Sequence, residues 1–420
     1  MDETSDGALS SGQLMHLYDQ LEHPTNHWTT VRSALTLDFR LAESEMRNLL
    51  TFICAKHDGV HSRIVRHEQG FRQLVTSLEY FFDTCVRFAV SSDPDIAAEW
   101  DSTLIDVLTC SSMFVVVFGA ETTTVHHLGH HAFFDRTAVD LLLTEIAVAA
   151  RDPEITSGRA SRRPSPARGL QPWQVRELEL LPPAVRATQR WQEFHGVRRE
   201  LPWPDRDLSL RTMTHTCVFG LGTEFARSCE ETARRWSMSL TSALNAAVGA
   251  HLAIEFGGSE ITVKAISSNR FRRGFGDAVA CVSGEIWTAH GTEGAGTPAW
   301  CQEFAAAQLT AYRHAFYTWD VVRRSPNFRT PYRSNQTIMI NTLTDAGPRP
   351  PGDSMWQIPD VVSLSPLYVP LSLTTDLQVH ITLAGSEIGF SLSAGHEHFD
   401  DAALADFSRG LKKFLVQHFA

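Results

Sequence analysis

The stretch that decides the fold runs Val125-His126-His127-Leu128-Gly129-His130-His131-Ala132-Phe133-Phe134-Asp135-Arg136. Four of the protein's 19 histidines fall within its first seven positions. Before it stand three threonines at 122–124, which favour a β-strand, and Gly129 favours a strand that runs into a loop. The sequence therefore predicts a strand whose end presents histidines.

A metal site and simple packing are two interpretations of these histidines. His126/His130 and His127/His131 have the i,i+4 spacing of metal ligands, but that spacing shares a face only on a helix. On a strand, neighbouring side chains point to opposite faces. We therefore expect no metal here, and we expect His126 and His127 to be packed.

The third interpretation is catalytic. A histidine at a strand end, followed by a tight turn and a helix, can project into a cleft. With an ordinary pKa near 6.5, a neutral imidazole can take a proton from an alcohol or amine nucleophile. Asp135 lies too far along the turn to reach the same ring, so we expect it to bind an arginine and shape the loop.

Outside this stretch, helix and strand patterns alternate along the chain. Residues 71–81 are strand-like or mixed, and the mixture as a whole predicts an α+β fold. Helices are predicted over 43–57, 137–150, 173–198, 222–237, 241–256 and 401–418, and strands over 113–118, 122–127, 261–267, 336–342, 376–384 and 387–393.

One segment reads as a linker. Residues 151–172 hold several Pro, Gly, Ser and Arg residues without apolar periodicity. We therefore predict an N-terminal lobe over 1–172, which includes this linker, and a C-terminal lobe over 173–420. A length of 420 residues agrees with two large lobes.

Composition excludes several classes of protein. With 43% hydrophobic and 20% charged residues the chain is not mainly disordered, and a net charge of −11 disfavours nucleic-acid binding. Seven scattered cysteines without C-x-x-C spacing predict neither a disulfide framework nor a zinc knuckle. No apolar run is long enough to span a membrane, and the acidic start MDETSDGALSSGQ is unlike a signal peptide. We expect a cytoplasmic protein without a membrane partner.

The segment His130-His131-Ala132-Phe133-Phe134-Asp135 resembles the HHxxxD signature of the condensation-domain superfamily. That superfamily includes nonribosomal peptide synthetase condensation domains and related acyltransferases, among them chloramphenicol acetyltransferase. Further segments resemble family motifs in the expected order: 9–18 the opening S-x-x-Q motif, 56–64 the R-H-E segment, 186–194 the Y-W helix, 267–270 the G-R segment, 279–283 the V-G-x-F-V-N strand, and 371–399 the final pair of strands.

The resemblance implies two lobes, each similar to a chloramphenicol acetyltransferase monomer, arranged as a V with a tunnel between them. It implies His131 as base or positioning group, His130 and Asp135 as structural members of the catalytic motif, and Arg270 as the structural partner of Asp135. Gly129 and Arg136 are expected beside the substrate. We expect His130 to face the protein and His131 the tunnel, and a bidentate contact between Asp135 and Arg270.

Two departures from the family pattern concern substrate handling. Arg136 stands where the family usually has a glycine, so its side chain either lies near the site or turns onto the helix start. The segment 279–283 reads VACVS, without the family's Gly and Asn. Cyclisation domains, which have aspartates in place of the histidines, are not matched.

The resemblance implies a free-standing condensation enzyme for natural-product biosynthesis. It would transfer an acyl or aminoacyl group from a carrier-protein thioester to an amine or alcohol acceptor. The alternatives are an ester-forming acyltransferase that uses acyl-CoA, and a non-catalytic docking module. We expect no cofactor, because the donor carries the phosphopantetheine and the thioester supplies the driving energy.

Overall fold

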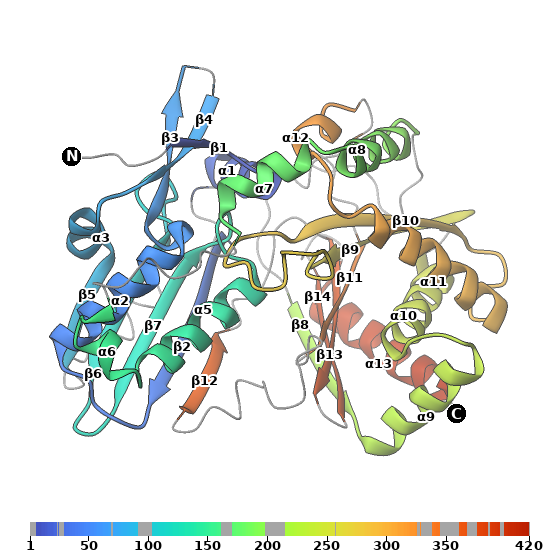
Figure 1. Cartoon of the computed structure of the whole chain (residues 1–420). Helices are drawn as coiled ribbons and strands as arrows, with labels where there is room; N and C mark the ends of the chain where they lie inside the picture. The colour runs from blue at the N-terminus through green and yellow to red at the C-terminus, as the bar shows by residue number, and fades with distance from the viewer. Residues whose placement is uncertain are drawn as a thin grey trace.

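The structure, a computed structural model, has two lobes that lie side by side, each built from a sheet with helices packed on it (Figure 1). The α+β prediction is confirmed, while the V shape and the tunnel stay predictions. The residues that the structure describes are 6–22, 24, 29–68, 70–90, 103–160, 170–197, 215–256, 258–325, 328, 338–344, 361–367, 376–384, 387–394 and 399–419.

The N-terminal lobe holds a small and a large sheet. The small sheet has the order β1 (Asp6–Ala8), β4 (Gly70–Val75), β3 (Ser62–His67). The large sheet has the order β12 (Val361–Leu367), β2 (Thr30–Leu37), β7 (Thr123–His130), β6 (Ser112–Phe118), β5 (Val86–Val90). Its described helices are α1 (Ser11–Glu22), α2 (Glu43–Lys56), α3 (Leu78–Cys85), α5 (Arg136–Ala149) and α6 (Pro153–Thr156), with a 3₁₀ turn at Asp58–His61.

The sheet of the C-terminal lobe has the order β10 (Gly284–Gly291), β9 (Glu260–Ser267), β11 (Ile338–Thr344), β13 (Leu377–Ala384), β14 (Glu387–Ala394), β8 (His215–Leu221). The helices described from residue 170 onward are α7 (Pro172–Glu179), α8 (Pro182–Phe194), α9 (Thr223–Arg235), α10 (Leu240–Phe256), α11 (Pro298–Arg313), α12 (Trp319–Val322) and α13 (Asp401–Phe419). In Figure 1, α7 and α12 lie at the junction of the lobes.

Most predicted elements are confirmed within a residue or two, because each carries its own apolar pattern. The helix predicted over 137–150 is α5, and the strand over 113–118 is β6. The mixed stretch 71–81 divides between β4 and α3, while the single helix predicted over 173–198 is two helices, α7 and α8. Pro182 and Pro183 begin α8, since proline is accepted in a first helical turn and not in a helix interior.

The predicted linker is partly a packed element. Within 151–160, α6 buries Ile155, and the Asn48 side chain of α2 donates a hydrogen bond to the Thr156 carbonyl at 2.8 Å. This stretch therefore belongs to the N-terminal lobe as a docked helix, and α7 already begins at Pro172. The middle of the linker, 161–169, lies outside the described residues.

One strand crosses between the two parts of the chain. Strand β12, which comes from 361–367, pairs antiparallel with β2 at the edge of the N-terminal sheet. Figure 1 shows it in red beside the blue β2. The predicted division between residues 172 and 173 does not account for this strand. By sequence β12 belongs to the C-terminal lobe (173–420), but it pairs with the sheet of the N-terminal lobe.

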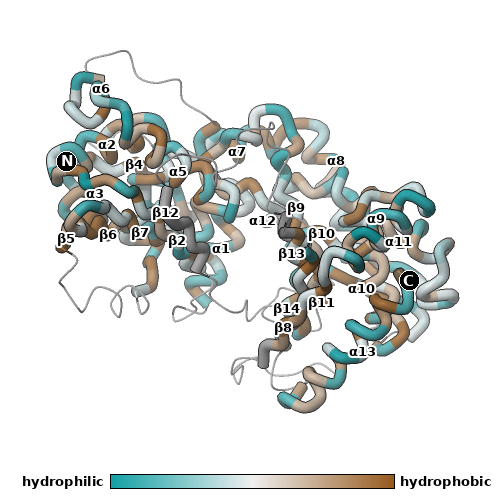
Figure 2. The backbone as a smooth tube through the Cα atoms, turned by 90° about the horizontal axis from the view of Figure 1, so that it is seen from below, coloured by the Kyte–Doolittle hydropathy of each residue, from teal (hydrophilic) through white to brown (hydrophobic). Residues whose placement is uncertain are grey.

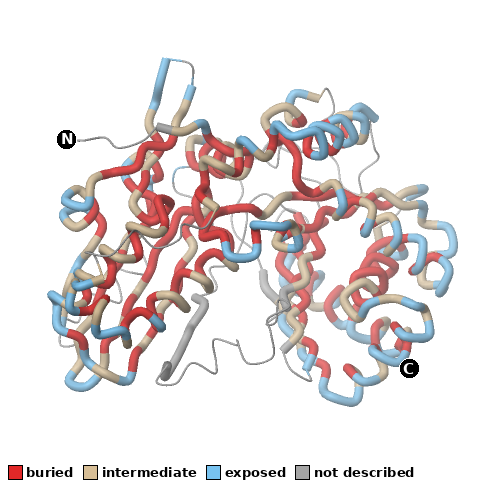
Figure 3. The backbone as a smooth tube through the Cα atoms, viewed as in Figure 1, coloured by how far each residue is buried: buried red, intermediate tan, exposed pale blue. Residues whose placement is uncertain are grey.

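Each lobe has its own hydrophobic core. In the N-terminal lobe, α2 and α5 pack on the large sheet through residues such as Leu50, Leu142 and Val125. In the C-terminal lobe, α10 and α13 pack on theirs. Figure 3 shows buried backbone along the strands of both lobes, and Figure 2 shows hydrophobic colour in the same strands. No helix among the described residues is long and apolar enough to span a membrane.

Strand β7 is paired on both sides, by β2 and β6, so its residues are deeply buried. His127 is fully buried between the rings of Phe114 and Phe134, at centroid distances of 4.9 and 5.1 Å. The prediction that His127 is packed is thereby confirmed. Burial lowers the pKa of His127 to about 3, because the charged imidazolium cannot be solvated there.

We expect His127→Leu to flatten the pH dependence of stability. The unfolded chain binds a proton at His127 below about pH 6.5 and the folded chain does not, so stability is lost as pH falls from 6.5 toward 3. At pH 5 this residue costs the parent roughly 2 kcal/mol relative to pH 7. Urea unfolding at both pH values measures the difference. The exposed control His67→Leu should follow the parent, and parallel curves for all three proteins would contradict the assignment.

Candidate active site

The strand that carries the histidine motif ends at His130, and a tight turn follows. The His130 N–H donates to Ser111, and the His131 N–H donates to the Thr29 carbonyl, both at 2.7 Å. The N–H groups of Phe133 and Phe134 donate to the His130 carbonyl. These bonds close the turn before α5 starts, so backbone hydrogen bonds on both sides of the motif determine where His131 lies.

His130 faces the protein interior, as its expected structural role requires. Its ring is fully buried, and Nδ1 accepts a hydrogen bond from the Ala132 N–H at 3.1 Å. That bond leaves the ring proton on Nε2. Burial lowers the pKa of His130 to about 3, so the ring is neutral and orients the turn.

His131 lies where the two lobes meet and is half-buried. Its ring stacks on His16 of α1, with centroids 4.1 Å apart and an interplanar angle of 17°. Nδ1 lies 4.0 Å from Cys281 Sγ in the C-terminal part. Burial lowers the pKa of His131, while the charge of Asp135 works in the opposite direction. The imidazole is therefore neutral at pH 7 and able to accept a proton.

Asp135 joins the motif to the other lobe. Oδ1 accepts the Ala138 N–H at 2.8 Å, which makes Asp135 the N-cap of α5, and it also accepts Arg270 Nη2 at 2.5 Å. Oδ2 accepts the Val282 N–H at 3.1 Å. The predicted pairing with Arg270 is thus confirmed. The expected bidentate geometry was wrong, because a backbone N–H occupies the second carboxylate oxygen.

Arg270 holds the loop that precedes β10. Nη1 donates to the carbonyls of Phe275 and Ala278 at 2.9 and 2.5 Å, and Nη2 donates to Ala280 at 3.0 Å as well as to Asp135. A guanidinium presents five N–H groups in one plane, so one side chain can satisfy several carbonyls and a carboxylate together. Arg270 therefore couples the loop to the motif.

The segment 279–283, predicted as a strand, is an extended loop that ends where β10 begins at Gly284. It does not pair with another strand, because side chains form hydrogen bonds with its backbone. Asp135 accepts the Val282 N–H, and Asn269 donates to the Val282 carbonyl at 2.8 Å. Asn269 has a φ of 54°, a left-handed conformation that asparagine tolerates better than most residues. The loop is shaped by the inter-lobe contact.

Gly129 and Arg136 do not line the cavity that lies between α1, α7 and the loop before β10. Gly129 is buried in β7, where an added Cβ would lie 2.8 Å from both the His127 ring and the Phe134 ring. The Arg136 side chain is exposed and pairs with Asp140 one turn along α5, at 3.1 Å. Of the two alternatives for Arg136, the structure shows the one that turns onto the helix start. Their contact with substrate stays a prediction without support from the geometry.

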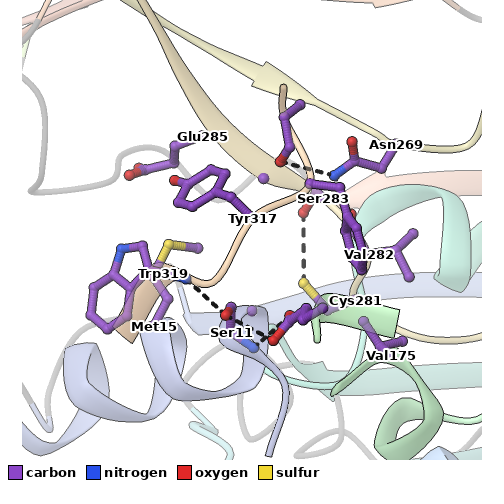
Figure 4. A pocket seen from close by; sticks show the side chains of 15 residues that line it. Ser11, Met15, Val175, Asn269, Cys281, Val282, Ser283, Glu285, Tyr317 and Trp319 are labelled. Atoms are coloured by element: carbon purple, nitrogen blue, oxygen red, sulfur yellow. Dashed lines mark hydrogen bonds between the residues drawn. The ribbon is translucent and has the colours of Figure 1, made fainter. Parts of the chain in front are cut away.

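A cavity lies between α1, α7 and the loop before β10, and it encloses about 370 Å³ of space, part of it open to solvent. Figure 4 shows Cys281 in its wall, with Ser11 and Trp319 across from Glu285. The residues that line it are Ser11, Gly12, Met15, Val175, Glu179, Asn269, Cys281, Val282, Ser283, Gly284, Glu285, Ala315, Phe316, Tyr317 and Trp319. Both lobes therefore contribute to the wall.

Two buried carboxylates of this wall were not found from the sequence. Glu179 accepts the N–H and Oγ–H of Ser11 at 2.8 and 2.9 Å and pairs with Arg176. Burial raises the pKa of Glu179 to about 7, against the opposing effect of those bonds. Glu285 pairs with Lys264 of the adjacent strand at 2.8 Å. Neither belongs to a quoted motif, and only cross-strand pairing or lobe contact reveals them.

Two side chains that contact or lie close to His131 were also missed as site residues. His16 and Cys281 lie within segments 9–18 and 279–283, so the resemblance indicated the segments but not these positions. Together with His131 they form a group of three metal-ligand side chains among the described residues. It differs from the i,i+4 pairs considered in the sequence, because His126, His127 and His130 lie on β7 while His16 and Cys281 come from distant segments.

We expect Asp135→Ala to lower the free energy of unfolding by about 3–5 kcal/mol, because Arg270 is left as a buried charge without its carboxylate. Urea denaturation measures this loss. The matched control is Arg136→Ala, which breaks an exposed pair and should change stability by less than about 0.5 kcal/mol. Equal, small effects of the two substitutions would contradict the role given to the buried pair.

Gly129→Ala should destabilise the protein by roughly 1–3 kcal/mol, because the new methyl group overlaps the His127 and Phe134 rings in a filled core. Thermal unfolding measures the shift. Gly220→Ala is the control, since an added Cβ there meets nothing within 4 Å. A variant of normal stability that is weakened only in substrate binding would favour the original expectation of a substrate contact.

Comparison with known proteins identifies the architecture. No family model matches the sequence, and no curated protein matches it. Among solved structures, the first condensation domain of the calcium-dependent antibiotic synthetase, in complex with a substrate analogue, is similar over 100% of this chain and 97% of its own, with 16% identity and a TM-score of 0.71.

Two further structures cover the chain equally well. The condensation domain from the Monacolin K polyketide synthase MokA matches over 100% of this chain and 98% of its own, with 12% identity and a TM-score of 0.75. The starter condensation domain of rhizomide synthetase RzmA matches over 99% and 96%, with 13% identity and a TM-score of 0.71. From end to end, this chain therefore has the fold of condensation domains.

Proposed function

We propose that the protein is a condensation enzyme. It transfers an acyl or aminoacyl group from a carrier-protein thioester to an amine or alcohol acceptor, in natural-product biosynthesis. The observation that carries the proposal is the position of His131, a neutral, half-buried imidazole at the lobe junction. His131 does not itself line the inter-lobe cavity, but its Nδ1 lies 4.0 Å from the sulfur of Cys281, which does.

The reaction needs one proton to move. As the acceptor nitrogen or oxygen attacks the thioester carbonyl, His131 takes the proton that this atom loses. The carbon–sulfur bond then breaks, and the departing thiolate receives the proton. Atoms and charge balance without a cofactor in the protein, since the thioester is the activated species. His131 contributes as a positioned general base.

The remaining motif residues act through position. His130 is held by the backbone of the turn, and Asp135 and Arg270 hold that turn against the loop that carries Cys281. These contacts therefore determine how far His131 lies from the loop that carries Cys281. A substrate that binds between the lobes would meet a base in a defined position. Such orientation is a large part of what enzymes contribute to bimolecular reactions.

A coenzyme A thioester is a second candidate donor. One of the similar structures, a double mutant of the RzmA starter condensation domain, is described in complex with C8-CoA and Leu-SNAC. The donor in this protein is accordingly to be tested as a carrier-bound and as a coenzyme A thioester, with amine and alcohol acceptors. The alcohol product with a coenzyme A donor corresponds to the ester-forming alternative.

The test is to incubate the purified full chain with each donor and acceptor combination and to search for products by mass spectrometry. Acyl transfer that is faster than the uncatalysed reaction supports the proposal. If the carrier-bound thioester reacts faster than the coenzyme A thioester, the donor is a carrier protein. A folded protein that binds a carrier protein and yields no product in any combination would instead be a docking module.

His131→Ala should lower turnover by about 10²–10⁴-fold, the usual contribution of a general base. Its unfolding free energy should stay close to that of the parent, which separates a catalytic loss from the structural loss expected for Asp135→Ala. His67→Ala, at an exposed histidine of β3, is the control and should keep full activity. Turnover of His131→Ala within a few-fold of the parent would refute the assignment of the base.

A further inference from the structure

Three side chains from distant parts of the sequence converge at the lobe junction. His16 comes from α1, His131 follows β7, and Cys281 precedes β10. One ring nitrogen from each histidine and the cysteine sulfur all lie within 4.8 Å of one another. His131 Nδ1 lies 4.0 Å from Cys281 Sγ. His16 and Cys281 are buried, and Cys281 is the member of the group that lines the cavity.

From this geometry we propose that His16, His131 and Cys281 bind a Zn²⁺ ion. Imidazole nitrogen and thiolate sulfur are the ligands that zinc prefers in proteins, whereas magnesium and calcium need oxygen ligands. Three protein ligands leave one tetrahedral position unfilled. Since Cys281 lies in the cavity wall, a water molecule from the cavity can take that position.

Binding requires a small movement of the side chains. With zinc bonds of about 2.0–2.3 Å, tetrahedral geometry brings neighbouring ligand atoms to roughly 3.3–3.6 Å. Ligand atoms that lie up to 4.8 Å apart here must therefore approach one another by up to about 1.2–1.5 Å. The rings of His16 and His131 are stacked, and an ion cannot lie in both ring planes at once. Zinc binding therefore requires one of the two imidazoles to rotate about its side-chain bonds.

The surroundings contain the outer contacts that zinc ligands use. Asp19 Oδ2 lies 3.7 Å from His16 Nδ1, one turn along the same helix. At 3.7 Å the two groups are close without a hydrogen bond, and a small rotation of His16 would form the carboxylate–histidine pair that orients a metal-binding imidazole. Ser283 Oγ lies 3.6 Å from Cys281 Sγ and can hydrogen-bond to the thiolate. Both partners are side chains that the proposed acyl transfer does not use.

The binding step balances with the release of one proton. Burial raises the pKa of the Cys281 thiol to about 12, so the sulfur is protonated before binding. Zn²⁺ displaces that proton to solvent and forms the zinc–sulfur bond, and both histidines bind as neutral imidazoles. The bound group carries a net charge of +1.

The consequence for activity rests on the proposed function. A histidine that binds zinc has lost the lone pair with which it would accept a proton. Bound zinc therefore inhibits acyl transfer, and a chelator restores it. The site would make the enzyme sensitive to the concentration of available zinc.

The chain supplies a matched control. Cys301 Sγ lies 3.7 Å from His418 Nε2, so a buried cysteine and a half-buried histidine form a pair of nearly the same separation. No third ligand joins that pair among the described residues. Two donors bind zinc much more weakly than three, so a Cys301→Ser variant tests whether a cysteine–histidine pair alone suffices.

The binding test uses chelator-treated full chain and competition with a chromophoric zinc indicator. One strong site per chain is expected, weakened about 100-fold or more in Cys281→Ser and in His16→Gln, and unchanged in Cys301→Ser. Cobalt serves as a second probe, because a thiolate-to-cobalt charge-transfer band should appear in the parent and vanish in Cys281→Ser. Circular dichroism checks that each variant is folded.

The outcomes separate the two proposals. The zinc site would be overturned if the parent and Cys281→Ser bound zinc equally well, or if the cobalt complex of the parent lacked a thiolate band. Either result would count regardless of the acyl-transfer activity. A thiolate–cobalt band in a protein with no acyl transfer would uphold the site and leave the proposed function refuted. Full turnover at saturating zinc would exclude His131 as a ligand and overturn the proposal as stated.

Discussion

The ion pair between Asp135 and Arg270 is the contact on which the rest of the site depends. It joins the end of the histidine turn to the loop before β10, and each partner is tied further into its own lobe. Asp135 caps α5, while Arg270 satisfies three carbonyls of the loop. A buried charge without its partner is costly. Moving the lobes apart would separate Asp135 from Arg270, so this ion pair opposes such a movement.

Neutral histidines are the second constraint. His127 and His130 have pKa values of about 3, and burial also lowers the pKa of His16 and His131. A charged imidazole at this depth would be poorly solvated, so the structure keeps the motif in its unprotonated form. The same burial that stabilises the fold at neutral pH thus supplies the protonation state that a base requires, and that a zinc ligand requires as well.

The similarity to condensation domains at 12–16% identity has a physical basis in the two cores. Cores accept extensive replacement of one apolar residue by another when pattern and volume are kept. The helices α2, α5, α10 and α13 carry such patterns, and their packing on the two sheets maintains the architecture. The cavity wall has no such freedom, since Glu179 and Glu285 each need a specific partner.

The sequence by itself determined those features that depend on residues close together along the chain. The apolar stripe of 137–150 and the β-branched run of 113–118 identified α5 and β6, and the HHxxxD pattern indicated His131 as the candidate base, since each signal is local. The pairing of Asp135 with Arg270 was within reach only through the family resemblance. Tertiary structure alone decided that β12 joins the N-terminal sheet, that 279–283 is a loop, and that His16 and Cys281 lie beside His131. These contacts join residues more than a hundred positions apart, and their partners are chosen by the packing of whole lobes, which no local pattern records.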